Sequence, residues 1–205
     1  MLTIANTEVY GFDAAIRGMR NPMNSWDKSD SCDLHDYNPL LGENDLKLMK
    51  SLSKAGSDHA KFLRMINVTV DITAPLYWWK EFDTYKVGTV ANSCSTMHKI
   101  HAKEFTLDDF SHEHLGGEFL ESLNSTISIL NRARNKYLDS KAKQLWWQMI
   151  QLLPSSYNQT RTVQLNYQVL KSMYFARKDH KLDEWHTLCD WMLTLPYFRD
   201  ICVDV

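Results

Sequence analysis

The feature that most constrains the fold is the helical apolar periodicity between Leu123 and Trp191. It begins as a long amphipathic helix, continues as an apolar run that stops at Leu153 and Pro154, and resumes after a polar turn as a third helix. In that third helix Asn166 and Arg177 are eleven positions apart. This is close to three turns at about 3.6 residues per turn, so both side chains can lie on one face. A chain with this periodicity is predicted to be mainly helical.

Polar and apolar side chains occupy neighbouring sides of the third predicted helix. The polar side contains Asn166, Gln168, Ser172 and Arg177. The side that would face the core contains Val169, Leu170, Met173 and Tyr174. A seam of amide, hydroxyl and guanidinium groups beside a core can bind a planar ligand. Two alternatives remain open: a solvated helix face and, for Arg177, a surface ion pair with Asp179 or Asp183.

The order of motifs in this half resembles the C-terminal half of the flavin-dependent thymidylate synthases. That family reads roughly LP, followed by W-T-x-N-x-R-S-L-x-x-F-x-x-L-R. The residues that match this pattern are Leu153, Pro154, Thr162, Asn166, Leu170, Ala176 and Arg177. The resemblance implies that Arg177 contacts the pyrimidine base and that Asn166 and Ser172 lie near the flavin.

The first half of the chain predicts a small sheet and further helices. Alternating β-branched residues predict strands over 2–10 and 65–72. Helical spacing and end signals predict helices over 12–19, 43–55, 76–85, 107–123 and 182–195, whereas 86–106 has the composition of a loop. The predicted fold class is α+β, a mostly helical single domain over 1–205 with a small sheet. It resembles the flavin-dependent thymidylate synthase fold.

A second part of the resemblance concerns the loop after the predicted helix 76–85. The family has a G-H-x-S turn, a strand, and an S-R-x-x-x-Q helix that runs into R-H-R-x-x-S-x-N-E-x-S-x-R-Y. The same order occurs here, starting at 56–59. We align Asn92 and Ser95 with N-E-x-S, which aligns Ser93 with the glutamate. In this register R-H-R corresponds to Tyr85, Lys86 and Val87. The arginine and the tyrosine at the end of the motif correspond to Met97 and His98. Aligning from the preceding strand shifts this register by two residues.

In this register the resemblance implies a site that several segments share. The cofactor-binding residues would be Asn92, Ser95, Asn166 and Ser172. The substrate-binding residues would be Tyr85, Lys86, Ser93, Gln168 and Arg177. The catalytic residue would be Arg177, because a cation beside a ring carbonyl stabilises negative charge that develops there.

The sequence departs from the family where phosphate-binding charge is expected. Arginine suits phosphate because its planar fork meets two oxygens at once and keeps its charge. The tyrosine and valine aligned with R-H-R cannot replace it, and the lysine between them is only a point charge. Gln168 also stands where the family has arginine, and Ile150 and Gln151 occupy the neighbourhood of the arginine that precedes LP. These departures argue against the family's usual mode of flavin and deoxyuridylate binding.

The resemblance implies transfer of a one-carbon unit to C5 of a pyrimidine deoxynucleotide such as dUMP. The family uses FAD, NADPH and methylene-tetrahydrofolate, and it forms homotetramers with sites shared between chains. An alternative is a non-catalytic nucleotide-binding or structural homologue that has lost the flavin site. Altered chemistry on the same fold, such as hydroxymethyl transfer, is a third possibility that the residues do not rank.

Charge and composition argue against several other classes. The formal net charge of −2 and the lack of a basic stripe argue against a general DNA or RNA binder and a membrane-surface protein. No apolar run approaches the ~20 residues of a membrane span, and no signal peptide is visible, so a cytoplasmic protein is expected. The cysteines lack C-x-x-C spacing and are expected to be free thiols: Cys32, Cys94, Cys189 and Cys202.

Histidines and tryptophans suggest two further hypotheses. The close histidines are His98 with His101 and His112 with His114. Imidazole is a common metal ligand, but this spacing matches no established motif, so we expect exposed loop histidines and no metal. The tryptophan pairs Trp78-Trp79 and Trp146-Trp147 suggest base stacking. Because helix neighbours point about 100° apart, we expect one member of each pair in the core and the other at a subunit contact.

Overall fold

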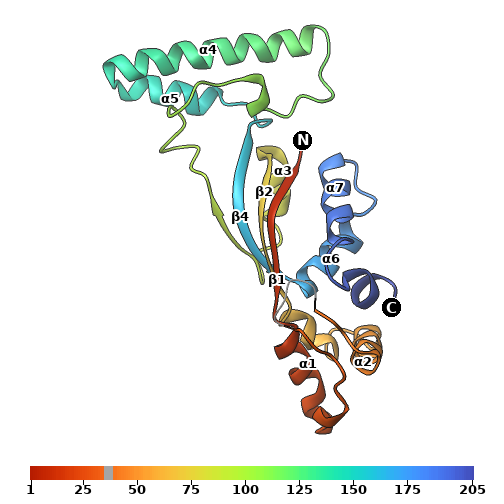
Figure 1. Cartoon of the computed structure of the whole chain (residues 1–205). Helices are drawn as coiled ribbons and strands as arrows, with labels where there is room; N and C mark the ends of the chain where they lie inside the picture. Colours follow the sequence, from red (N-terminus) through yellow and green to blue (C-terminus); the bar gives the residue numbers. More distant parts are fainter. Residues whose placement is uncertain (35–38) are drawn as a thin grey trace. The chain divides into compact units, whose positions relative to one another are not determined.

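The computed structural model describes residues 1–34 and 39–205, which form a four-stranded antiparallel sheet and a larger number of helical residues (Figure 1). The strands are β1 (Thr3–Tyr10), β2 (Asn67–Pro75), β3 (Val90–Ser93) and β4 (Asn158–Asn166), in the order β1-β2-β4-β3. The α-helices are α1 (Phe12–Arg20), α2 (Glu43–Lys54), α3 (Leu76–Phe82), α4 (Glu118–Ser140), α5 (Lys143–Leu152), α6 (Tyr167–Arg177) and α7 (Asp183–Met192). The predicted α+β class, mostly helical with a small sheet, is confirmed. No helix in the described ranges is long and apolar enough to cross a membrane.

The chain forms two compact units, and each is built from separated segments. The first unit comprises Met1–Thr3, Ile72–Thr84 and Asn92–Arg161. The second comprises Ile4–Asp71, Tyr85–Ala91 and Thr162–Val205. The domain boundaries 1–205 stay a prediction.

The core of the first unit lies against the hairpin of α4 and α5, which run side by side (Figure 1). The buried side chains of α4 are Leu123, Ile127 and Leu130, whose spacing of four and three places them on one helix face. They share a cluster with Met149 of α5 and with the buried ring of Phe110. The apolar face of α4 therefore packs against α5 and Phe110, and this packing positions the hairpin within the first unit.

The core of the second unit fixes the beginning of α6. Tyr167 is fully buried, and its backbone N–H donates to the carbonyl of Ile66 at 3.0 Å. Its hydroxyl donates to the carbonyl of Pro196 at 2.7 Å, and its ring meets those of Phe12 and Phe198 edge to face. Because both polar groups are paired inside the core, the first turn of α6 has a defined position for the side chains it carries.

The prediction of a polar turn followed by a helix that includes Asn166 is wrong, because residues 158–166 form strand β4. The buried positions Gln159, Val163 and Leu165 lie on one face of this strand, an even number of residues apart. Asn166 is the N-cap of α6, and its side chain accepts a hydrogen bond from Val169 N. Polar residues dominate this stretch, so only its position beside β2 and β3 supplies the hydrogen bonds that make it a strand.

Two further boundaries differ from the prediction. The helix expected over 107–123 is a 3₁₀ turn at Leu107–Asp109, and α4 begins only at Glu118. The loop expected over 86–106 contains strand β3, all of whose residues are exposed. A strand with no buried face has no apolar alternation, so periodicity cannot reveal it.

The four cysteines are free thiols in two kinds of environment. Cys32 and Cys94 are exposed, whereas Cys189 and Cys202 are buried. Burial, aided by Asp190 and Asp179, raises the pKa of Cys189 to about 11. Burial raises the pKa of Cys202 to about 12, against an opposing effect of Lys171.

We therefore expect iodoacetamide at pH 8 to label only Cys32 and Cys94 in the native protein. The thiolate is the reactive form, and both burial and a raised pKa suppress it in Cys189 and Cys202. Mass spectrometry of native and urea-unfolded samples measures this directly. Labelling of Cys202 as fast as that of Cys32 in the native protein would contradict the expectation.

Candidate functional site

Arg177, at the C-terminal end of α6, is held by two aromatic side chains of the second unit. Its Nε donates to the hydroxyl of Tyr85 at 2.9 Å. The guanidinium carbon lies 4.7 Å from the ring centroid of Trp185 and 5.6 Å from that of Tyr85. Tyr85 and Trp185 meet edge to face with their centroids 6.0 Å apart. The guanidinium is thus oriented by a hydrogen bond and by cation–π contact.

The loop that carries Tyr85 lies against the N-terminal end of α6. Gly88 has a φ of +79°, and a Cβ added there would be 3.1 Å from Val169 Cγ2 and 3.3 Å from Asn166 Nδ2. A side chain would therefore press on the cap of the helix as well as strain the backbone. In the same loop Thr89 Oγ1 is enclosed and has no hydrogen-bond partner among the described residues. In the second unit, therefore, the loop that carries Tyr85 lies against α6, which has Asn166 as its N-cap and Arg177 as its last residue.

The polar groups of several predicted cofactor residues are engaged within the chain. Asn166 Oδ1 accepts from Val169 N at 3.1 Å. Ser172 Oγ donates to the carbonyl of Gln168 at 3.0 Å, and Ser95 Oγ accepts from His98 N at 2.9 Å. The Asn166 amide nitrogen and the remaining hydroxyl lone pairs are still available to a ligand.

Asn92, Ser93 and Ser95 belong to the first unit, where β3 and the residues after it are exposed. The chain there is fastened through Gln159, whose Nε2 donates to the carbonyl of Cys94 at 2.7 Å. Arg161 Nε donates to Gln159 Oε1 at 3.0 Å, and its guanidinium carbon lies 4.2 Å from the ring centroid of Trp79. Sequence reasoning missed this network, because Gln159 and Arg161 fall in the stretch assigned to a polar turn.

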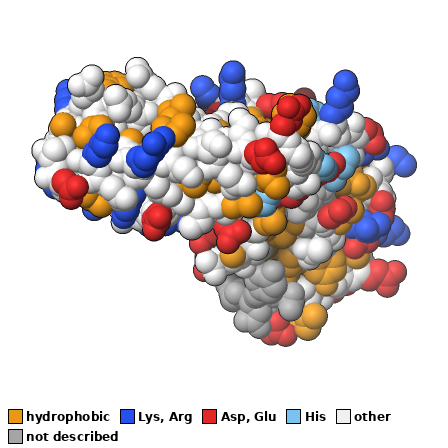
Figure 2. Space-filling view, turned by 90° about the horizontal axis from the view of Figure 1, so that it is seen from above, with side chains coloured by type: hydrophobic (Ala, Val, Ile, Leu, Met, Phe, Trp, Pro, Cys, Tyr) orange, Lys and Arg blue, Asp and Glu red, His pale blue; other side chains and the backbone are white. Residues whose placement is uncertain are grey.

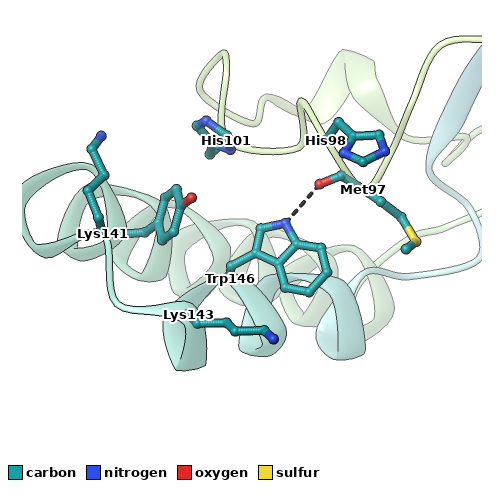
Figure 3. A pocket seen from close by; sticks show the side chains of 7 residues that line it. Met97, His98, His101, Lys141, Lys143 and Trp146 are labelled. Carbon is teal, nitrogen blue, oxygen red and sulfur yellow. Dashed lines mark hydrogen bonds between the residues drawn. The ribbon is translucent and has the colours of Figure 1, made fainter.

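A groove of about 310 Å³ in the first unit brings the His98–His101 pair together with Trp146 (Figure 3). Its lining residues are Met97, His98, His101, Tyr137, Lys141, Lys143 and Trp146. The indole Nε1 of Trp146 donates to the carbonyl of Met97 at 2.8 Å. The other histidine pair does not line this groove, and His112 Nδ1 lies 2.8 Å from the carbonyl of Phe110. Among the described residues no group of three His, Cys, Asp or Glu side chains could hold a metal ion.

The tryptophan pairs differ from the expectation of one core residue each. Trp78 and Trp79 are both buried, so neither is available for a subunit contact. Trp79 Nε1 donates to the carbonyl of Gln159 at 2.9 Å, which lets it remain buried. In the second pair Trp146 is half-buried and Trp147 is exposed, so only this pair has the predicted asymmetry.

The segment aligned with R-H-R does not fit the pyrophosphate of FAD in the family's manner. The Tyr85 hydroxyl is engaged with Arg177, Lys86 is exposed, and Val87 is 91% exposed. None of the three offers the paired N–H donors of a guanidinium. On the face seen from above, basic, acidic and hydrophobic side chains are interspersed and the basic ones do not form a stripe (Figure 2). We therefore assign no reaction step to the flavin.

Comparison with known proteins gives a match in structure. No family model and no curated protein matches the sequence. The flavin-dependent thymidylate synthase ThyX from Helicobacter pylori, complexed with FAD and dUMP, superposes with a TM-score of 0.69 over 98% of this chain and 99% of that one, at 17% identity. The UMP/dUMP methylase PolB from Streptomyces cacaoi, bound with 5-Br dUMP, gives 0.63 over 98% and 92%, at 14% identity. This chain therefore has the fold of the flavin-dependent thymidylate synthases.

Proposed function

We propose that this chain binds a pyrimidine nucleotide such as dUMP and transfers a one-carbon unit to C5 of its base. The observation that carries the proposal is the guanidinium of Arg177, held by Tyr85 and Trp185 at the end of α6. The fold supports it, because a synthase complexed with dUMP and a UMP/dUMP methylase share that fold almost from end to end.

The role proposed for Arg177 is electrostatic. A planar cation can donate hydrogen bonds to a carbonyl oxygen of the pyrimidine ring, and it stabilises the negative charge that the ring gains when C5 reacts. Tyr85 would hold the guanidinium in plane through its 2.9 Å hydrogen bond, and Trp185 would support its face. Such preorganisation avoids reorientation of the cation during the reaction.

The other residues of the proposed site have binding roles. Asn92, Ser95, Asn166 and Ser172 would contact the cofactor. Tyr85, Lys86, Ser93 and Gln168 would contact the nucleotide together with Arg177. FAD, NADPH and methylene-tetrahydrofolate are proposed as co-reactants from the resemblance alone. A homotetramer is proposed on the same basis. A cytoplasmic location without DNA, RNA or membrane partners is proposed from the charge and composition of the chain.

A second candidate function is a nucleotide-binding or structural homologue that has lost the flavin site. It is favoured by Tyr85 and Val87, which replace phosphate-binding arginines of the family. In the nucleotide-binding version Arg177 still binds the base, and in the structural version it binds no nucleotide; neither version transfers a one-carbon unit.

Flavin and nucleotide titrations separate the two candidates. The first predicts that the purified protein takes up FAD, seen as quenching of flavin fluorescence, and that calorimetry detects dUMP binding. The nucleotide-binding homologue predicts dUMP binding with no change in flavin fluorescence up to millimolar FAD, and the structural homologue predicts neither. Absence of heat with both dUMP and UMP would refute a nucleotide-binding role of either kind.

A further inference from the structure

The segment at 92–95 carries three of the proposed ligand contacts, and it lies at the edge of the sheet. Its first two residues end β3, which is the outermost strand next to β4, and all residues of β3 are exposed. An edge strand has a hydrogen-bonding neighbour on one side only, and an exposed one gains no burial that would fix it. The position of Asn92, Ser93 and Ser95 must therefore be set by contacts between this segment and the rest of the first unit.

Both backbone groups of Cys94, within this segment, are paired with residues of β4. Its N–H donates to the carbonyl of Thr160 at 2.9 Å, and its carbonyl accepts from Gln159 Nε2 at 2.7 Å. The second bond comes from a side chain, so it depends on which residue stands at position 159. Gln159 thus links the segment at 92–95 to the neighbouring strand.

Arg161 determines which end of the Gln159 amide faces Cys94. Arg161 Nε donates to Gln159 Oε1 at 3.0 Å. Because a guanidinium carries donors only, the amide oxygen must face Arg161, and the amide nitrogen then faces the Cys94 carbonyl. Gln159 is 8% exposed, so water has little access to either bond.

Helix α3 in turn holds Arg161. Arg161 Nη1 donates to Asp83 Oδ1 at 2.7 Å, and the guanidinium carbon lies 4.2 Å from the ring centroid of Trp79. Trp79 is buried, and its indole N–H donates to the carbonyl of Gln159 at 2.9 Å. A continuous set of contacts therefore runs from α3 through Arg161 and Gln159 to the segment at 92–95.

The stability of the sheet alone does not account for these side chains. Val163 and Leu165 are apolar at buried positions of β4, as a core requires, whereas Gln159 places an amide at such a position. A buried amide gains little net free energy over an apolar side chain, even when its hydrogen bonds are made. Connected polar groups at core positions fix one geometry, and such local departures concentrate at functional sites.

We propose that Gln159 is a positioning residue of the nucleotide site and that Arg161 orients it. Gln159 fixes the segment at 92–95 before the ligand binds, so its side chains need little ordering during association. Neither Gln159 nor Arg161 touches the ligand. The inference rests on the proposed function, because the segment contacts a nucleotide only if that function is correct.

The substitution Gln159→Glu tests the amide donor alone. The carboxylate has nearly the shape of the amide and still accepts from Arg161 Nε, but it offers no N–H to the Cys94 carbonyl. The adjacent guanidinium keeps this carboxylate ionised near neutral pH. We expect the Cys94 amide to exchange with deuterium at least about tenfold faster in ¹H–¹⁵N spectra. We also expect calorimetry to show a rise of about tenfold in the dissociation constant for dUMP.

A second variant and a matched control accompany this substitution. Gln159→Met removes both polar groups without burying a charge, and it should change both measurements in the same direction. Gln164→Glu is the control, because Gln164 lies exposed on the same strand and its amide donates to the Tyr10 hydroxyl. It should leave both measurements unchanged. The amide of Tyr167, in the core of the second unit, reports global unfolding and should exchange at the wild-type rate in all three variants.

The outcomes separate this inference from the proposed function. A Cys94 amide that exchanges at the wild-type rate in both Gln159 variants would overturn the positioning role, whether or not a nucleotide binds. Equal acceleration at Cys94 and Tyr167 would also overturn it, because the loss of stability would then be global. Faster exchange at Cys94 with unchanged affinity for dUMP would remove its link to the site. A wild type that binds neither dUMP nor UMP would instead refute the proposed function, and the exchange rates would still decide whether Gln159 fixes the segment.

Discussion

Replacing Arg177 with alanine is expected to lower one-carbon transfer to dUMP by about 10²–10³-fold, the effect of losing one preorganised donor at a developing negative charge. A cation–π contact such as that between Arg177 and Trp185 contributes about 1 kcal/mol to the free energy of unfolding, so the variant should still fold. The measurement is thymidylate formation with added FAD, NADPH and methylene-tetrahydrofolate, together with a thermal melt. If the wild type shows no turnover, the dissociation constant for dUMP is the readout, and a loss of about tenfold is expected.

Two substitutions separate the role of Arg177 in binding from a purely structural one. Arg177→Lys keeps the charge and loses the planar fork, so it should restore little of the activity. Tyr85→Phe keeps the ring and removes only the hydroxyl that accepts from Arg177 Nε. It should cost less than Arg177→Ala, because the guanidinium remains. Wild-type turnover and wild-type dUMP affinity in Arg177→Ala would show that this arginine has only a structural role.

Replacing Asp45 with alanine is expected to lower the free energy of unfolding by about 3–5 kcal/mol, because it leaves the buried charge of Arg20 without its partner. Both side chains are buried. Arg20 Nε donates to Asp45 Oδ1 at 2.7 Å, and the hydroxyls of Ser29 and Ser31 donate to Oδ2 at 2.8 and 2.7 Å. This carboxylate therefore joins α1 and α2 to the segment at 29–31.

Urea denaturation measures this effect, with Asp13→Ala as the matched control. Asp13 forms an exposed ion pair with Arg17 four residues later, so its loss should cost less than about 1 kcal/mol. The double variant Arg20→Met/Asp45→Leu should be more stable than Asp45→Ala, because no unpaired charge stays buried. A loss below 1 kcal/mol for Asp45→Ala would contradict the view that the pair supports this unit.

The depressed pKa of Asp45 determines how the stability of the folded protein changes as the pH falls. Burial raises the pKa of Asp45, but the hydrogen bonds from Ser31, Ser29 and Arg20 outweigh burial and hold the pKa below its usual value of 3.8. Because the folded-state pKa is depressed, the stabilisation is present above about pH 4 and is lost as the pH falls through the folded-state pKa. Asp45→Asn should remove this part of the pH dependence, which urea titrations at several pH values measure.

Local periodicity predicted the elements whose stability comes from their own side-chain pattern. The apolar periodicity that begins at Leu123 predicted most of α4, and Pro154 marked the end of the following helix. The alternating β-branched run over 65–72 predicted β2, which is observed at Asn67–Pro75. Strands β3 and β4 escaped prediction because one has no buried face and the other is rich in polar residues. Their hydrogen bonds come from neighbouring strands that lie far away in the sequence.

The sequence by itself determined the mainly helical character of the chain, strands β1 and β2, and the resemblance to the synthases. An α-helix pairs its backbone groups within one segment, so its signal is local. Only the tertiary structure decided which side chains meet. It placed Tyr85 against Arg177 across 92 positions, and it brought the lysines at the end of α4 and the start of α5 to the histidines at 98 and 101. Such contacts depend on packing between distant segments, for which a single sequence carries no periodic signal.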